Sequence, residues 1–351
     1  MGIVPYLRKK DSVIIWSVQK FELAEDCLRR YFYRYGPPHI PKPQTGPMAY
    51  GRFLHKKTEH FFKEDEDFIP REGLEKFYAP TAVPKNKSPE SFTATCCNNW
   101  RFMFMQDLCA RKKIQWSWGE AYAYLHELEI FAPVLYERTL TQGNPAFAEL
   151  AFSNIPLRHK NHYHYFLGRI DDVRRCGDQL TVRDHKTGRD HPTDYTLYHD
   201  LQFTVYGLAL LHLLGTNQRL AERLGMRPTD AASWVGHEAE FLPLLTMERH
   251  EVRTGELRQT TRTPLHAHEL FEKLDGLEAQ IERHSYPAER NDVRCNRCYV
   301  YKQCAEDFAQ GGKSYPLQRK LFFEHQLETS QPALEIPREK ARIVQHRLKF
   351  G

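Results

Sequence analysis

The chain has 351 residues, of which 41% are hydrophobic and 27% are charged. This length corresponds to one elaborated domain or to two domains of roughly 150 residues, with a core large enough to fold without disulfide bonds. The longest apolar run, residues 205–211, is too short to cross a membrane, and residues 1–15 lack a signal-peptide cleavage site. These features exclude membrane-embedded and disordered classes, and we expect a soluble, cytoplasmic protein without a membrane partner.

The formal net charge is only +5, because 50 Lys and Arg residues face 45 Asp and Glu residues. The charge is unevenly distributed. Residues 1–35 and residues 316–351 each carry seven basic and four acidic residues. These two ends would form a basic surface for nucleic acid only if the fold brings them together.

The N-terminal part of the chain is predicted to be helical. Ser17 is a suitable N-cap for a helix over residues 17–35, which Gly36-Pro37-Pro38 would end. The spacing of apolar residues predicts a second helix over residues 49–63.

After an insertion without an obvious motif, the pattern changes at about residue 148. Strand character is found in residues 148–152, 165–173 and 179–184. Residues 174–178 are expected to form the turn between the last two strands. A strongly apolar helix is expected over residues 194–215, followed by a strand within 230–290 and a helix over 265–283.

Two acidic residues and a lysine form the most informative pattern. If residues 168–184 form a hairpin, Asp171 and Asp184 come from neighbouring strands and can face one site. Residues two apart on a strand project to the same side, so Lys186 joins Asp184 while His185 points away. Two adjacent carboxylates repel each other unless a cation lies between them, and Mg2+ is the usual cation where phosphates react. The alternative is a surface hairpin with ordinary charges.

Three further residues are candidates for the same site. Gln202 and Tyr206 are four residues apart on one face of the expected apolar helix, either as hydrogen-bonded core residues or at the edge of the site. His55 lies on the expected helix 49–63, where a structural or surface histidine is the alternative.

In this order, the six side chains resemble the RecB-like branch of the PD-(D/E)xK nuclease superfamily, over residues 12–63 and 148–304. The resemblance implies an α/β fold with a restriction-endonuclease-like core, in which helices flank a mixed central sheet. One or two Mg2+ or Mn2+ ions are then expected, and the implied ligands are His55, Asp171, Asp184 and the backbone carbonyl of His185. The chain departs from the pattern at Ile170, where the name of the superfamily has Pro.

The resemblance also implies roles for the remaining residues. Lys186 would activate the attacking water, and Gln202 and Tyr206 would orient the strand or the substrate. Glu149, on the preceding strand, is a secondary candidate for a position just outside the ligands. The implied function is metal-dependent DNA hydrolysis, on single strands or DNA ends. A role as the nuclease subunit of a larger assembly is compatible with this activity. The alternative is a non-catalytic DNA-binding or scaffold subunit of a repair, phage or defence complex.

Eight cysteines are present, and three of them have the spacing of metal ligands, Cys295-x2-Cys298-x5-Cys304. The sequence alone does not select a fourth ligand. AddB-type nuclease domains and CRISPR-associated RecB-like exonucleases, which the chain resembles here, imply Cys27 as that ligand and a [4Fe-4S] cluster that joins the two ends of the domain. Zn2+ on four cysteines and unliganded thiols are the alternatives.

Basic and aromatic residues alternate directly after Cys27. Arg29, Arg30 and Arg34 could contact DNA phosphates, and the tyrosines between them could stack on bases or belong to the core. Four parts of the chain are therefore expected. They are an N-terminal part of the nuclease domain (1–63), a mostly helical insertion (64–147), the nuclease core with the cluster cysteines (148–304) and a basic tail (305–351).

Overall fold

The structure is a computed structural model. It describes residues 13–36, 39–43, 45–63, 119, 122–124, 126–127, 145–177, 179–187, 191–251, 254–283, 285 and 295–310, and only the backbone of 56–63, 176 and 308–310. Most of the expected insertion and the tail beyond residue 310 lie outside the described residues, as do Cys96, Cys97 and Cys109. Residues 119, 122–124 and 126–127 of the insertion are helical, whereas 145–147 lead into a strand. The ring of Tyr124 stacks on Tyr50 with 4.3 Å between the ring centroids.

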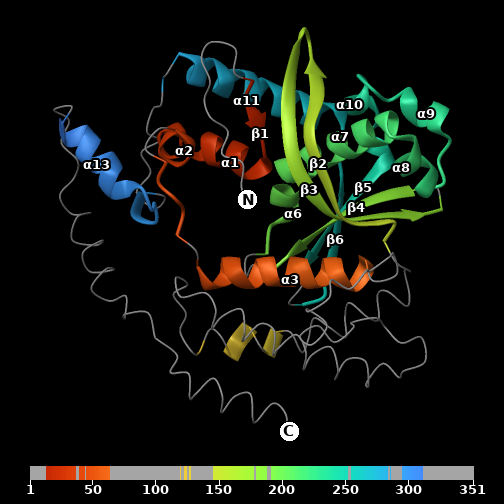
Figure 1. Ribbon diagram of the computed structural model, residues 1–351, viewed down its shortest axis with the longest axis horizontal. Helices are drawn as coiled ribbons and strands as arrows, with labels where there is room; N and C mark the ends of the chain where they lie inside the picture. The colour runs from red at the N-terminus through yellow and green to blue at the C-terminus, as the bar shows by residue number, and fades with distance from the viewer. Residues whose placement is uncertain are drawn as a thin grey trace, which may run out of the picture.

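A six-stranded mixed sheet forms the centre of the fold, in the order β1-β3-β4-β5-β6, with β2 also paired to β3 (Figure 1). The strands are β1 (Ile15–Trp16), β2 (Phe147–His159), β3 (His162–Cys176), β4 (Gln179–Lys186), β5 (Leu245–Glu251) and β6 (Leu257–Thr261). β3 runs antiparallel to β2 and β4, whereas the β1–β3 and β4–β5 pairs are parallel. The expected mixed α/β fold is therefore confirmed.

Several strands extend beyond their expected bounds: β2 continues to His159, β3 begins at His162 and β4 ends at Lys186. β3 continues to Cys176, so the turn before β4 is tighter than the expected 174–178, and Gly177 adopts the left-handed conformation there, with φ 61°. The segment 230–290 holds two strands, β5 and β6, where one was expected.

The N-terminal helix is broken in the middle. Ser17 caps α1 (Val18–Asp26) by accepting a hydrogen bond from the Lys20 backbone N–H, as expected. Cys27 then adopts an extended conformation, with φ −167° and ψ 108°, and a second helix, α2 (Leu28–Tyr35), follows. The prediction of one helix over residues 17–35 was wrong, because the chain leaves the helical path at Cys27. α3 (Gly46–Lys63) covers the other expected helix.

The apolar segment after β4 is also divided. A short helix, α6 (Asp194–Tyr198), ends before Asp200, whose carboxylate accepts a hydrogen bond from the Gln202 backbone N–H and caps α7 (Leu201–Thr216). The prediction of one helix over 194–215 was wrong at this cap. The remaining helices are α8 (Gln218–Arg223), α9 (Pro228–Ala232), α10 (Glu238–Phe241), the 3-10 turn η1 (Leu242–Leu244), α11 (Pro264–Glu282) and α13 (Tyr301–Gln310).

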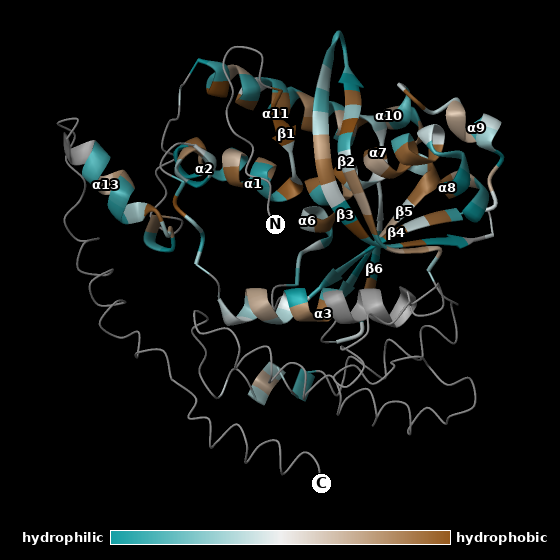
Figure 2. Ribbon diagram, in the orientation of Figure 1, coloured by the Kyte–Doolittle hydropathy of each residue, from teal (hydrophilic) through white to brown (hydrophobic). Residues whose placement is uncertain are grey.

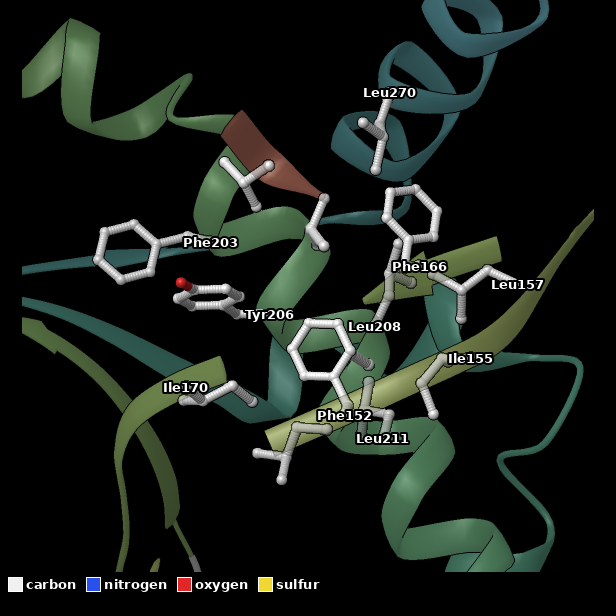
Figure 3. Packing of buried hydrophobic residues seen from close by; sticks show 14 of the residues in the cluster. Phe152, Ile155, Leu157, Phe166, Ile170, Phe203, Tyr206, Leu208, Leu211 and Leu270 are labelled. Atoms are coloured by element: carbon white, nitrogen blue, oxygen red, sulfur yellow. The ribbon is translucent and has the colours of Figure 1, made fainter. Parts of the chain in front are cut away.

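α7 forms the centre of the core. It is buried along most of its length, and its side chains pack against the strands and α11 (Figure 3). Figure 2 shows this apolar interior and the hydrophilic tip of the β2–β3 ribbon. Val173, Val182 and Met247 lie side by side on neighbouring strands and belong to the core that α7 joins. Among the described residues, no helix is long and apolar enough to cross a membrane.

Charged residues occupy the alternate positions of the same strands. Asp172, Arg183 and Glu248 lie opposite one another on β3, β4 and β5, and all three are buried. Arg183 Nε donates to Glu248 Oε2 at 2.8 Å, so the buried charges are paired. Because side chains alternate along a strand, Asp171 and Asp184 point to the opposite face, where α7 begins.

Candidate active site

A cleft of about 850 Å3 lies where α1, α3 and α7 meet the strands. All the candidates from sequence that belong to the carboxylate and lysine pattern line this cleft: His55, Glu149, Asp171, Asp184, His185, Lys186, Gln202 and Tyr206. They come from α3, β2, β3, β4 and α7, so the fold brings together residues that are up to 151 positions apart (His55 to Tyr206).

His55, Glu149 and Asp171 form one wall of the cleft. Nδ1 of His55 lies 3.3 Å from Oε1 of Glu149 and 3.3 Å from Oδ1 of Asp171. One ligand atom from each of the three residues lies within 4.8 Å of the others, which is close enough to hold one metal ion. Glu149 is therefore beside the other two, although the sequence suggested only an outer position for it.

The backbone at Glu149 is unusual. Glu149 lies between the paired residues Ala148–Asp172 and Leu150–Ile170, and its φ is 54°, in the left-handed region. A residue other than glycine pays of order 1–3 kcal/mol for this conformation, which is found often at functional sites. The side chain is 7% exposed. Arg169 Nη1 donates to its Oε2 at 3.4 Å, whereas its Oε1 accepts no hydrogen bond from the described residues.

Asp184, Lys186, Gln202 and Tyr206 form the opposite wall. Lys186 Nζ lies 2.7 Å from Asp184 Oδ2 and donates to Gln202 Oε1 at 2.6 Å. Gln202 Nε2 donates to Asp184 Oδ1 and to the Tyr206 hydroxyl, both at 2.8 Å. The predicted neighbourhood of the strand motif and the helix pair is therefore present. The Tyr206 ring packs against Phe152 among the core residues (Figure 3), and its hydroxyl accepts a hydrogen bond from Gln202 in the cleft.

The backbone of His185 contacts the cleft, whereas its side chain lies on the other face of β4. Its backbone N–H donates to Asp171 Oδ2 at 2.8 Å, and its ring Nδ1 lies 2.8 Å from Nδ1 of the buried His250 on β5. The side chain therefore points away from Asp184 and Lys186, as the strand period predicted. The role of the His185 carbonyl as a metal ligand stays a prediction.

The charges in the cleft depend on one another. Burial raises the pKa of Asp171 above its ordinary value; His55 opposes this shift, while Asp184 and Glu149 add to it. Burial acts to lower the pKa of His55, but Asp171 and Glu149 outweigh burial and raise it. Burial likewise acts to lower the pKa of Lys186, and Asp184 outweighs it, so that Lys186 is held as a cation.

The sequence analysis missed three charged residues that line the cleft: Glu22, Arg52 and Arg169. Arg52 precedes His55 by three residues on a helix, and Arg169 precedes Asp171 by two residues on a strand. Both spacings place side chains on one face and could have identified them. Glu22 lies on α1, and burial, together with Asp200, raises its pKa. No local pattern connects α1 to the cleft.

The four cysteines with described side chains, Cys27, Cys295, Cys298 and Cys304, are thiols and lie in one neighbourhood. Burial raises the pKa of Cys298, and the charges of Cys27 and Cys295 raise it further. Burial, followed by the charge of Cys27, raises the pKa of Cys304 to about 11.

Helix α2 begins directly after Cys27 and packs against the segment that carries the other three cysteines. Tyr33 of α2 packs with Val300 and Cys304 in a small cluster of its own, and Figure 1 shows α13 on the side of the fold where α2 lies. Tyr31 belongs to the main core. Arg30 forms an ion pair with Asp26, and the guanidinium of Arg34 lies 5.8 Å from the ring centroid of Tyr35. The predicted arginines are therefore partly buried beside the cysteines, and they are not among the residues that line the cleft.

Fold and cleft together define a mixed α/β protein with a candidate site for a divalent metal, built from carboxylates, an imidazole and a lysine. The family model of the PD-(D/E)XK nuclease superfamily matches residues 15–305. The chain belongs to this superfamily, whose members are mostly nucleases that act on DNA and use divalent metals. A search of curated protein sequences finds no significant match.

Proposed function

We propose that the protein is a Mg2+- or Mn2+-dependent deoxyribonuclease that acts as an exonuclease on single strands or DNA ends. The observation that carries this proposal is the pairing of Asp184 with Lys186 beside the group of His55, Glu149 and Asp171. The carboxylates of Glu149, Asp171 and Asp184 therefore converge in one cleft, which Glu22 also lines. A divalent ion with oxygen ligands would bind between them and reduce their mutual repulsion.

The residues present fit such an ion. Oε1 of Glu149 is buried and has no hydrogen bond of good geometry to the described residues; its ion-pair contact is Nδ1 of His55, at 3.3 Å, so a metal ion could bind beside both. Carboxylate oxygens are the ligands that Mg2+ prefers, and a histidine nitrogen is compatible with Mn2+. We propose that Glu149 joins His55, Asp171 and Asp184 as a ligand, in place of the outer position expected from sequence.

Each residue of the cleft has a distinct part in this proposal. The bound metal would act as a Lewis acid on the scissile phosphate and lower the pKa of water. Asp184, 2.7 Å from the ammonium group of Lys186, keeps this side chain positively charged. Lys186 would then stabilise the negative charge that develops on the phosphate. Gln202 forms hydrogen bonds with both Asp184 and Lys186 and so fixes the positions of their side chains relative to each other. Arg52 and Arg169 provide positive charge at the cleft for the DNA backbone.

We further propose that Cys27, Cys295, Cys298 and Cys304 hold a [4Fe-4S] cluster. Their common neighbourhood and their state as thiols support this proposal. The raised pKa values of Cys298 and Cys304 favour protonated thiols in the absence of a metal. A metal centre would stabilise the thiolates, because the ligands must be deprotonated to bind.

Cleavage assays test the proposed function. Asp184→Asn and Lys186→Ala should each abolish the degradation of labelled DNA in Mg2+ or Mn2+, while folding and DNA binding persist. Asp230→Asn, an exposed carboxylate on α9, is the control and should cleave as the unmodified chain does. Protecting each end of single- and double-stranded substrates in turn would define the polarity.

Two results would contradict the proposal. Cleavage at the level of the unmodified chain by either cleft variant would mean that the reaction occurs elsewhere. DNA binding without cleavage by the unmodified chain, under all metal conditions, would support a non-catalytic DNA-binding or scaffold subunit instead.

A further inference from the structure

A second group of imidazoles and carboxylates lies on the β2–β3 ribbon, away from the cleft. His164 precedes Asp171 by seven residues on β3, which corresponds to about 23 Å along an extended strand. His162 and His164 are two residues apart and project to the same side of β3. α11 faces them with Glu272, Asp275 and Glu278, which are three residues apart and share one face of the helix.

His162, His164 and Glu278 form the tightest contacts of this group. Nε2 of His162 lies 3.0 Å from Oε2 of Glu278, and Nδ1 of His164 lies 3.2 Å from Oε1 of Glu278. One ligand atom from each residue lies within 4.8 Å of the other two. The side chain of His164 is 0% exposed, whereas that of His162 is 56% exposed. The three groups therefore converge on a point that is closed on one side and open to solvent on the other.

Two neighbouring groups hold these side chains in place. The indole Nε1 of Trp16 donates to Oε1 of Glu278 at 2.6 Å, which leaves Oε2 directed toward His162. Oδ1 of Asp275 lies 3.1 Å from Nε2 of His164. In metal sites, a carboxylate beside the second nitrogen of a ligating imidazole can orient the ring, and Asp275 is placed for this role.

The buried ring of His164 has a carboxylate oxygen at each nitrogen. Nε2 forms no hydrogen bond of good geometry with the described residues, although Asp275 lies beside it. Two carboxylates, Glu278 and Asp275, therefore lie against the imidazoles, and a divalent cation between them would reduce their mutual repulsion.

We propose that His162, His164 and Glu278 bind a Zn2+ ion that fastens the β2–β3 ribbon to α11. Two imidazoles and one carboxylate are ligands that Zn2+ accepts, whereas Mg2+ and Ca2+ prefer oxygen ligands alone. The fourth position faces solvent beside the exposed His162 and would take a water molecule. Through Trp16, the same site also fixes β1, so that it braces three segments distant in sequence. The proposal does not rest on the nuclease activity.

The neighbouring group of His159, His268 and Glu272 also has three possible ligands within 4.8 Å. There, however, Lys160 already forms an ion pair with Glu272, and Glu272 is largely exposed. The carboxylate charge is thus balanced without a metal, which favours His162, His164 and Glu278 as the site.

Zinc binding to the full chain tests the proposal, measured as zinc content after purification and by titration against a chromophoric chelator. His162→Ala should remove one zinc ion per chain. Its side chain is exposed, so the variant should fold, and thermal melting verifies this. Asp275→Asn should retain the ligands but weaken zinc affinity by about 10–100-fold. A structural ion pair alone would not produce this change.

His237→Ala provides the matched control. His237 is similarly exposed, at 62%, and its Nδ1 lies 3.2 Å from Oε1 of Glu240, without a third ligand among the described groups of this kind. This variant should keep the zinc content of the unmodified chain. Because only the difference between variants counts, zinc bound by the cysteines or in the cleft does not affect the result. Equal zinc content and affinity in the unmodified chain and His162→Ala would overturn the proposal and leave hydrogen bonds and ion pairs alone to join the ribbon to α11.

Discussion

The side-chain amide of Gln202 uses both of its ends to connect the residues of the active-site cleft. Its oxygen accepts from Lys186, and its nitrogen donates to Asp184 and to Tyr206. An isosteric glutamate could accept from Lys186 but could not donate to Asp184, and it would add a further carboxylate to the cleft. Glutamine is therefore suited to this position because it is neutral and bifunctional.

Gln202→Ala should lower kcat for DNA cleavage by about 100-fold, because a small misplacement of reacting groups costs that much. Lys186 would keep its ion pair with Asp184, but both side chains would no longer have the amide that orients them. The KM for DNA should change much less than kcat, since Gln202 acts through its neighbours. Steady-state kinetics on a labelled single strand would measure both.

Gln218→Ala is the control for this change. Gln218 also sits in the first turn of a helix and donates to one carboxylate, Glu222, but on the exposed surface of α8. Its kinetics should match those of the unmodified chain. A kcat for Gln202→Ala within a factor of two of the unmodified value would contradict the positioning role.

Much of the cleft could be predicted from the sequence because the periods of strands and helices decide which nearby residues share a face. The period of a strand places Asp184 and Lys186 together, and the period of a helix places Gln202 and Tyr206 together. The closeness of Glu149 to His55 depends instead on the pairing of β2 with β3 and on the left-handed backbone at Glu149. A local pattern carries no information on either, so the sequence suggested only an outer position.

At the scale of elements, two helical glycines have opposite surroundings. A Cβ atom on Gly215, near the end of α7, would come within 2.8 Å of the Ala231 carbonyl oxygen and 2.5 Å of Val235 Cγ2. Gly215 therefore permits the close approach of α7 and α9. A Cβ atom on Gly276 of α11 would meet no atom within 4 Å.

Alanine at these two positions should change stability in opposite directions. Gly215→Ala should lower the free energy of unfolding by about 1–3 kcal/mol, because the helices must separate. Gly276→Ala should raise it by about 0.5–1 kcal/mol, because alanine is the better helix former. Urea denaturation of both variants measures these values. A stabilised Gly215→Ala variant would contradict the packing of α7 on α9.

The break between α1 and α2 shows where prediction of elements from sequence ends. Ser17 and Gly36 were recognised correctly as the outer boundaries because caps are local features. Residues 17–35 contain neither glycine nor proline, so nothing in the segment itself indicates an interruption at Cys27. The cysteine neighbourhood, formed with a segment at the other end of the domain, lies at this interruption.

At the scale of the whole molecule, the proposed cluster predicts which cysteines are essential. Cys27→Ser should lose the iron as completely as Cys298→Ser, because each removes one of four ligands. Iron and zinc content and the visible absorbance of thiolate-bound iron, measured after anaerobic purification, would test this. The controls are Cys96→Ser and Cys109→Ser, which should keep the metal. A colourless chain that loses one zinc ion in the Cys298→Ser variant would support the rival zinc site.

The arginines of α2 should contribute to DNA binding through charge. Replacing Arg29, Arg30 and Arg34 with glutamine should weaken binding to all sequences about equally. The slope of log affinity against log salt should become flatter by about 0.7 for each phosphate that the variant no longer neutralises on single strands. Fluorescence anisotropy at several salt concentrations would measure the slope.

The control is a triple variant of Arg219, Arg227 and Arg283, which are exposed within or at the ends of other helices; it changes the net charge by the same amount. It should shift affinity slightly and leave the slope nearly unchanged. If the α2 variant also leaves the slope unchanged, the helix is a core element and DNA enters elsewhere, beside Arg52 and Arg169.

The class of fold could be predicted because six motif residues, which follow one another in a fixed order along the sequence, resemble those of the superfamily. The path of the chain could not. The parallel pairings of β1 with β3 and of β4 with β5 join segments far apart in sequence, and the break within the expected helix 194–215 follows from the cap at Asp200. These features depend on contacts that form only in the complete fold.

The hydrogen bond between Trp16 and Glu278 has a consequence for synthesis of the chain. The two residues are 262 positions apart. At about 5–20 residues per second, a ribosome needs roughly 13–52 seconds to reach Glu278 after Trp16 has been made. Throughout that time Trp16, fully buried in the finished core, has no permanent partner on α11. β3, the strand that pairs with β1, is made earlier, but the nascent chain can bury Trp16 against α11 only after this helix has left the ribosome.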